Sequence, residues 1–269
     1  MISFRQFLKE EKAPLPKTQD ETKKALWDFE DCFPDGISNC EIVDTAFGPA
    51  VNVKGSVNLR ALSLEYLPLR FNVVKGDFHC SMNKELKSVE GAPKWVKGIL
   101  NFEHCHSIKN LDYLALIGFQ SEGVASFSNC FELERVSESG KMLYTGGYIF
   151  NGCKKLTSLK GIGTIFGNLN IVGTDIHSLH DFHKDVQFTE AATENTGDLV
   201  LFNGAQRQEI AECGLNLMLV KGLKTITYPL SFKDMGWCEI IEAGIQSGED
   251  VFDVQSKLLD AGFPTQAKL

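Results

Sequence analysis

The stretch "FEHCHSIKNL", residues 102–111, sets a frame on which much of the chain can be aligned. It places an apolar side chain or a thiol at every third position, at Phe102, Cys105, Ile108 and Leu111. Two further copies of this frame follow along the chain. They are Phe127, Cys130, Leu133 and Val136, and Phe150, Cys153, Leu156 and Leu159. Three copies of a four-position frame indicate an internal structural repeat.

A looser copy of the frame precedes these three and a contracted copy follows them. The looser copy is Cys80, Asn83, Leu86 and Val89, and the contracted copy is Ile171, Thr174, Ile176 and Leu179. Starts at positions 80, 102, 127, 150 and 171 are 22, 25, 23 and 21 residues apart. This period is typical of leucine-rich repeats, whose short strand and return turn bury their apolar side only by stacking on neighbours. We therefore predict an α/β repeat solenoid, an irregular leucine-rich-repeat-like coil of short parallel strands with helical caps.

The second position of the frame is occupied by Asn83, Cys105, Cys130 and Cys153. An asparagine there turns the chain out of the strand and satisfies backbone groups, and cysteine can replace it as a small, buried, weak donor. A cysteine between two histidines also suits metal ligation. If Cys105 points inward, however, its histidine neighbours point away from it. We expect the thiols to be interior rungs and expect no metal site.

Strand alternation divides the side chains of each repeat between the interior and one outer surface. The expected inward side chains are Phe78, Cys80, Leu100, Phe102, Tyr148, Phe150, Leu169 and Ile171. The outward ones form a small, polar surface on the expected concave face, which suits either partner binding or simple solvation. Its candidate partner-binding residues are Asn58, Arg60, His79, Asn101, Glu103, Ser126, Asn151 and Asn170.

Changes in pattern along the chain divide it into five segments. Residues 1–10 carry a short apolar stripe, and the prolines and charges of residues 11–20 are typical of a linker. A helix is expected within an N-terminal cap, residues 21–54, before the solenoid of residues 55–200. Helical patterning returns in residues 201–269, which we expect to form a C-terminal helical cap because an array exposes its last repeat.

Composition excludes several classes of protein. The chain has 269 residues, 43% hydrophobic content and a net charge of −8. Nucleic acid is an unfavourable partner because binding to phosphates depends on Lys and Arg. No apolar stretch is long enough to span a membrane. Eight cysteines without a signal segment favour reduced thiols in a cytosolic setting.

No sequence signature brings together a nucleophile, a base and a stabilising group. The nearest candidate is "DIHSLHDFHKD", residues 175–185, where His177, His180 and His183 recur every three residues. The apolar residues between them share that period and continue the repeat, so we expect these histidines to lie along an exposed edge. We expect no catalytic residue, no enzyme activity and no cofactor.

Three phrases resemble a family of leucine-rich-repeat-like proteins encoded by large contractile-tailed bacteriophages. They are "LPLRFNVVKGDFHCSMNKELKSVEGAPKWVKG" (67–98), "LTSLKGIGTIFGNLNI" (156–171) and the ending "EDVFDVQSKLLDAGFPTQAKL". The resemblance runs from about residue 14 to the end and departs from the family's regular wording in residues 112–147, where repeat boundaries stay open. The resemblance implies a fold and a phage origin. It carries over no mechanism, because members of the family are largely without an assigned activity.

The stretch "MISFRQFLKE" separately resembles the capsid-targeting peptide of internal head proteins in such phages. The matching positions are the aromatic Phe4 and Phe7 and the cleavage motif of Leu8 and Glu10. The resemblance implies packaging with the prohead scaffold, a cut after Glu10 by the prohead protease and ejection with DNA. The expected locations are then the virion interior and, later, the host cytoplasm. An ordinary amphipathic start is the alternative.

Three functions fit these observations. We favour a non-enzymatic phage module that binds or inhibits a host defence or metabolic protein. The alternatives are a structural internal head or capsid protein and an early non-virion phage protein that binds a host factor. The partner's identity, the binding face, cleavage of the N-terminal peptide and the oligomeric state stay open at this stage.

Overall fold

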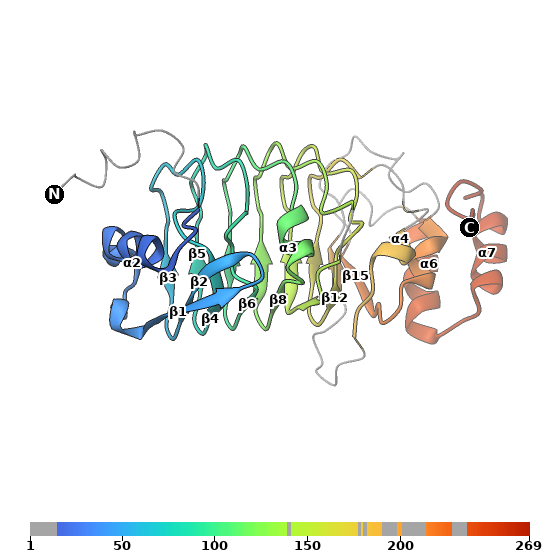
Figure 1. Ribbon diagram of the computed structural model, residues 1–269. Helices are drawn as coiled ribbons and strands as arrows, with labels where there is room; N and C mark the ends of the chain where they lie inside the picture. The colour runs from blue at the N-terminus through green and yellow to red at the C-terminus, as the bar shows by residue number, and fades with distance from the viewer. Residues whose placement is uncertain are drawn as a thin grey trace.

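The computed structural model describes residues 15–138, 141–176, 179, 182–189, 198–200, 214–227 and 236–269. These residues form a β-solenoid of parallel strands with about five turns. Figure 1 shows the turns stacked side by side along one axis, with helical segments at both ends. The predicted coil of short parallel strands is confirmed.

The strands of the predicted frame form one sheet, here called sheet B. In the described residues its order is β15-β14-β13-β11-β9-β7-β5-β3. Parallel pairing aligns Phe78 with Leu100 and Leu100 with Ala125, so each copy of the frame lies on the next. The strands are β3 (Val57–Asn58), β5 (Phe78–His79), β7 (Leu100–Asn101), β9 (Val124–Ser126), β11 (Gly147–Ile149), β13 (Leu169–Asn170), β14 (Asp198–Val200) and β15 (Thr225–Thr227).

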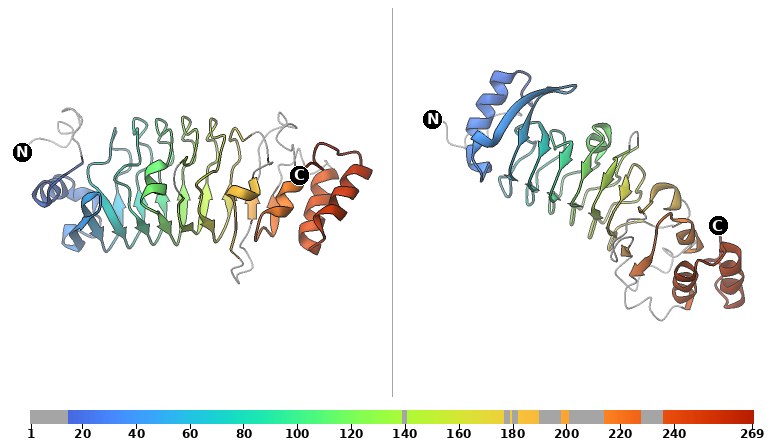
Figure 2. Two further views of the ribbon diagram at one scale, coloured as in Figure 1. Left: turned by 45° about the vertical axis from the view of Figure 1, so that its right-hand side comes forward. Right: turned by 90° about the horizontal axis from the view of Figure 1, so that it is seen from below.

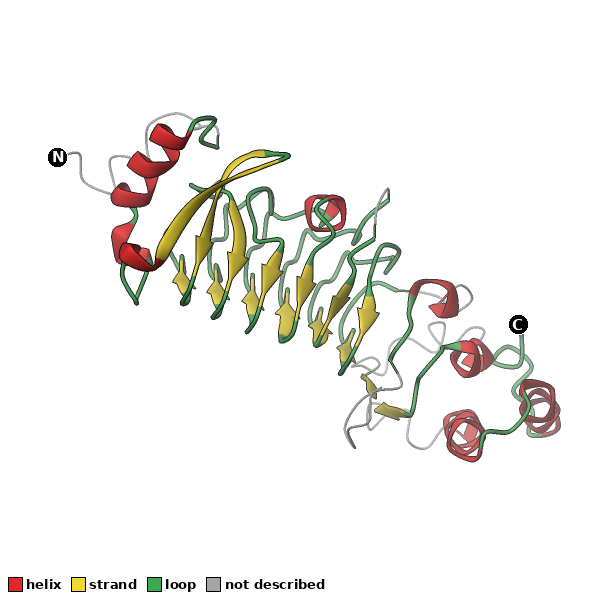
Figure 3. Ribbon diagram, turned by 60° about the horizontal axis from the view of Figure 1, so that its bottom comes forward, coloured by secondary structure: helices red, strands yellow, loops and turns green. Residues whose placement is uncertain are grey.

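The repeats that contain β3 to β13 each also contribute a strand to a second sheet, sheet A, so the single strand per repeat that we expected is corrected to two there. Its order in the described residues is β1-β2-β4-β6-β8-β10-β12, and all its pairs are parallel except the β1–β2 hairpin. Figure 3 shows the two rows of strands. The strands are β1 (Cys40–Thr45), β2 (Gly48–Val53), β4 (Phe71–Val74), β6 (Trp95–Val96), β8 (Gln120–Ser121), β10 (Tyr144–Thr145) and β12 (Thr164–Ile165).

The core lies between the two sheets. All eight side chains predicted to point inward are fully buried. The phenylalanine rings at the first frame position, Phe102, Phe127 and Phe150, form a column along the axis, with successive centroids 5.9 and 5.7 Å apart. Phe78 of β5 extends this column, with its centroid 5.9 Å from that of Phe102. Such offset aromatic contacts add to the free energy of simple apolar burial.

Helical segments lie mainly at the two ends of the array, as Figure 2 shows. Helix α2 begins at Gln19, inside the range expected to be linker, because Thr18 and Glu21 form a capping box. The helical segments are α2 (Gln19–Asp28), η1 (Glu30–Cys32), η2 (Ile37–Asn39), α3 (Asp112–Leu116), α4 (Phe182–Asp185), η4 (Gly214–Leu219), α6 (Gly236–Ser247) and α7 (Val251–Asp260). Helix α3 lies within the array, between β7 and β8.

A column of glycines forms the corner where the chain passes from sheet A to sheet B. A Cβ atom on Gly123 would lie 2.3 Å from the carbonyl oxygen of Gly98, and one on Gly167 would lie 2.2 Å from that of Gly146. These acceptor atoms belong to the backbone, which cannot move aside as a flexible side chain can. We call Gly98, Gly123, Gly146 and Gly167 the glycine corner.

Candidate functional site

The second frame position forms a ladder of buried polar groups, which we call the ladder corner: Asn83, Cys105, Cys130, Cys153 and Thr174. Asn83 donates through Nδ2 to the carbonyl oxygens of Leu59 and Cys80, at 2.8 and 2.9 Å, and its Oδ1 accepts from two backbone amides. The thiol of Cys105 continues the pattern by donating to the carbonyl oxygen of Cys80 at 3.2 Å. The predicted inward placement of the cysteines is confirmed.

The residue before each rung adopts a left-handed backbone conformation. Its φ is +64° at Met82, +58° at His104 and +58° at Asn129, while glycine takes the position at Gly152 and Gly173. This conformation is uncommon for residues other than glycine. It turns the chain so that the rung points into the core while the preceding side chain projects outward: Met82 and His104 are both exposed.

Burial makes the rung thiols unreactive by keeping them protonated. It raises the pKa of Cys105 and of Cys153 to about 12, and it raises the pKa of Cys130 well above the ordinary thiol value. The thiolate is the form that attacks electrophiles and binds metals. These three cysteines are therefore poor nucleophiles and poor metal ligands.

The histidines on either side of Cys105 lie on the outer surface. The His106 ring stacks on Phe131 with centroids 4.5 Å apart, and the His104 ring centroid lies 6.0 Å from that of His106. Burial lowers the pKa of His106, and the nearby Lys84 and His104 lower it further. The thiol points into the core and the rings point outward, so the three side chains do not converge on one ion.

A groove on the outer face of sheet B brings together most of the predicted partner-binding residues. Its volume is about 510 Å3. It spans the ends of β3, β5 and β7, where three adjacent turns stack. We call it the sheet B groove, and it is lined by Asn58, Arg60, His79, Ser81, Met82, Asn101, Glu103 and His104.

The asparagines of the groove have a structural task in addition to lining it. Asn58 Oδ1 accepts from the Arg60 amide at 3.2 Å, and Asn101 Oδ1 accepts from the Glu103 amide at 2.9 Å. Both bonds close a short turn at a strand end, as asparagine side chains commonly do. The same bond occurs at Asn170, whose Oδ1 accepts from the Val172 amide. Polar side chains at these positions therefore reflect strand termination as well as surface chemistry.

The three predicted residues from later turns do not line the groove. Ser126 is buried and donates to Glu103 Oε1 at 2.8 Å, so it positions that carboxylate. Asn151 is exposed, and Asn170 is half-buried at the end of β13. The structure thus brings five of the eight predicted residues to one hollow and leaves Ser126, Asn151 and Asn170 outside it.

Charge in the groove is mixed. Arg60 is exposed, and its Nη2 lies 3.4 Å from the Met82 sulfur. His79 Nε2 lies 3.7 Å from Asp77 Oδ2. Glu103 adds a second carboxylate. Among the residues the structure describes, no group of three or more His, Cys, Asp or Glu side chains could hold a metal ion. The groove offers hydrogen-bonding groups, charges of both signs and one thioether surface.

Met82 and His104 are the groove residues that sequence reasoning missed. Both lie beyond the strand ends, at left-handed positions where the alternation of side-chain directions is broken. Their signal is positional: each directly precedes a rung of the ladder. An exposed residue at that point in a turn must project outward, so alignment on the rungs could have found both.

Two other sets of predicted residues fall outside the described part of the chain. Phe4, Phe7, Leu8 and Glu10 belong to residues 1–14, and the side chains of His177, His180 and His183 are likewise not described. Within the described ranges, no helix combines the length and apolar character needed to cross a membrane.

Comparison with known proteins identified no relative of this chain. No family model, no curated protein and no solved structure matches this chain.

Proposed function

We propose that the protein is a non-enzymatic phage protein that binds a host protein through the sheet B groove. The supporting observation is that five residues chosen from strand alternation alone, Asn58, Arg60, His79, Asn101 and Glu103, line one hollow across three turns. Arginine, methionine and aromatic side chains are enriched in protein interfaces. Arg60 and Met82 provide the first two of these types at the groove.

The solenoid supplies a rigid base for such a surface. The groove residues sit at strand ends and on turns whose backbone is fixed by the rung bonds beneath them, for example those of Asn83. A pre-ordered surface loses little conformational freedom on binding. The groove is therefore suited to recognising a folded partner.

We also propose that the array is of the leucine-rich-repeat type and that its end helices act as caps. The repeat length and the Asn83 rung support the first point. Support for the second comes from buried side chains at both ends, including Leu26 of α2 and Ile241 of α6, which belong to the same apolar core as the repeats. A cap of this kind protects the open end of a stacked array.

Packaging in the phage head, a cut after Glu10 and ejection with DNA complete the proposal. It rests on the resemblance of residues 1–10 to a capsid-targeting peptide. N-terminal sequencing of the protein from purified particles tests it, and a mature start at residue 11 is the expected result. Finding the protein in particles that have already released their DNA would favour a structural head role. An intact Met1, together with absence of the protein from virions, would favour an early non-virion protein.

A paired-variant capture experiment tests the groove. Arg60→Ala with Met82→Ala removes the largest charged and apolar groups of the sheet B groove. Lys97→Ala with Leu143→Ala is the matched control, since it removes one cation and one exposed apolar side chain elsewhere. The parent and the control should capture the same host protein, and the groove variant should lose it. Equal capture by all three chains would contradict the assignment of the groove.

A further inference from the structure

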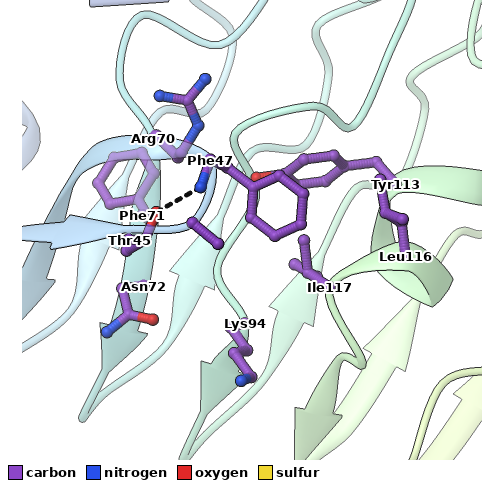
Figure 4. Close-up of a pocket in the computed structure, with 10 residues that line it drawn as sticks. Thr45, Phe47, Arg70, Phe71, Asn72, Lys94, Tyr113, Leu116 and Ile117 are labelled. Carbon is purple, nitrogen blue, oxygen red and sulfur yellow. Dashed lines mark hydrogen bonds between the residues drawn. The ribbon is translucent and has the colours of Figure 1, made fainter. Parts of the chain in front are cut away.

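A second hollow lies on the sheet A side, away from the sheet B groove. It opens between the β1–β2 turn and helix α3, and its volume is about 290 Å3. Figure 4 shows Phe47 of the turn and Tyr113 of α3 next to each other among the residues that line it. Their ring centroids are 6.2 Å apart in an edge-on arrangement. We call this hollow the hairpin pocket.

The walls of the hairpin pocket are apolar and its rim is basic. Ile117 and Leu116 continue the wall from Tyr113, and Arg70 and Lys94 provide the charges. Phe47 is 43% exposed and Leu116 is 65% exposed, so two large apolar side chains face solvent at one place. The volume is just below the roughly 300–1,000 Å3 of small-molecule clefts. An aromatic side chain with a short segment of chain suits it better than a free ligand.

The path of the chain itself points to an occupant. The Leu15 side chain lies beside Gly91, and Arg70 Nη1 donates to the carbonyl oxygen of Pro16 at 3.5 Å. Arg70 also lines the hairpin pocket, so residues 1–14 join the described chain at the pocket's edge. The eight residue-to-residue steps from Phe7 to Leu15 can span up to about 26–29 Å when extended.

Composition of the N-terminal segment matches the pocket. Phe4, Phe7 and Leu8 form an apolar stripe, and Glu10 and Glu11 follow it. These two carboxylates complement the basic rim, and the cationic residues of the segment, Arg5, Lys9 and Lys12, would have to lie away from that rim. Among described atoms, Arg70 Nε is buried without a hydrogen-bond acceptor, and a carboxylate or carbonyl oxygen from this segment would supply one.

We propose that residues 1–14 fold back onto their own chain and place an aromatic side chain of the Phe4–Leu8 stripe in the hairpin pocket. Docking covers the exposed Phe47 and Leu116, and it places Glu10 or Glu11 at the basic rim. This inference does not depend on the proposed host-binding function. If a protease does cut after Glu10, the cut removes the whole stripe and uncovers the pocket.

Hydrogen exchange on the full chain tests the docking. The probe variant is Phe4→Ala with Phe7→Ala and Leu8→Ala, and the matched control is Arg5→Ala with Gln6→Ala and Lys9→Ala. Peptides covering residues 43–48 and 112–118 should exchange several-fold faster in the probe variant than in the parent, and the control should match the parent. Equal exchange in all three chains overturns the proposal.

A reciprocal variant and a dilution series separate this occupant from others. Leu116→Asp places a charge on the pocket wall at an exposed position, and it should increase exchange in residues 1–14. Unchanged exchange there means that the segment does not use the pocket. The protection in the parent should be independent of protein concentration. Protection that grows with concentration assigns the pocket to a second copy of the chain and also overturns the proposal.

Discussion

The ladder corner and the glycine corner turn the same chain in opposite ways. At the ladder corner a side chain points inward and hydrogen-bonds the backbone of the preceding turn, as Cys153 does with the carbonyl oxygen of Phe127 at 3.0 Å. At the glycine corner no side chain fits, because the backbone of one turn lies against the next. One corner is fixed by a particular donor and the other by the absence of a Cβ.

This difference predicts how each corner responds to substitution. The ladder corner tolerates asparagine, cysteine and threonine, since all three are small groups that can donate to a carbonyl oxygen. The glycine corner tolerates no enlargement, whatever its chemistry. Polarity should therefore decide the cost at the first corner, and volume should decide it at the second.

The largest expected effect is at the ladder corner, with Cys130→Asp. Cys130 is fully buried, so a carboxylate there would lose its hydration, and the free energy of unfolding should fall by about 3–5 kcal/mol at neutral pH. Burial raises the pKa of such a carboxyl group. The loss of unfolding free energy should therefore shrink as the pH falls toward about 3.9, the pKa of an aspartate in the unfolded chain. Urea unfolding at several pH values measures the loss at neutral pH and its change with pH.

Cys130→Asn is the control for that experiment, because Asn83 occupies the equivalent rung with all its polar atoms bonded. It should be much milder than Cys130→Asp. Equal losses from the two substitutions would mean that volume, not polarity, limits the ladder corner.

At the glycine corner, Gly123→Ala should cost about 1–3 kcal/mol of unfolding free energy, the usual range for overpacking. The new Cβ would lie 2.3 Å from the carbonyl oxygen of Gly98. Gly236→Ala is the matched control, since among the described atoms its Cβ would meet Phe263 ring atoms at 3.4 and 3.5 Å, an ordinary contact distance. Similar unfolding midpoints for the two variants would show that the turns can separate without cost.

The ladder corner can be predicted from the sequence, but the glycine corner cannot. Cys105, Cys130 and Cys153 recur in a fixed frame with apolar neighbours, which alignment detects. Glycines such as Gly98 and Gly146 mark turns in almost any fold, and only the stacked backbones show why they are required. The later strands of sheet A could not be predicted for a related reason: the positions aligned there, such as Trp95, Gln120 and Tyr144, share no residue type that an alignment of repeats could detect.

The candidate site divides in the same way. Alternation along β3, β5 and β7 predicted Asn58, His79 and Asn101, because residues within a strand have fixed directions. Met82 depends on a left-handed backbone that its own identity does not favour. The fold imposes that conformation, so single-residue preferences could not reveal it.

An effect that depends on pH should distinguish the rung thiols from surface thiols. Burial raises the pKa of Cys105 from 9.0 to about 12, so the folded state holds this proton more tightly than the unfolded state. The contribution of this buried thiol to the free energy of unfolding is complete below pH 9 and is lost as the pH rises toward 12. Relative to Cys105→Ala, the parent should lose about 1.4 kcal/mol of unfolding free energy per pH unit in that window. Parallel pH profiles would contradict the burial of this thiol.

The smallest effect is expected just outside the ladder corner, on its solvent side. Lys155 Nζ lies 2.6 Å from Glu132 Oε2 on the neighbouring turn, and the same arrangement joins Lys87 to Glu65 at 2.7 Å. Both pairs are solvated, and water and salt screen such charges. Lys155→Gln and Lys87→Gln should each leave the urea midpoint unchanged at physiological ionic strength. A loss comparable to that of Gly123→Ala would place part of the stacking energy on the surface. The corner would then be held from outside as well as by its rung, and the contrast between donor and volume would no longer account for the stability of the array.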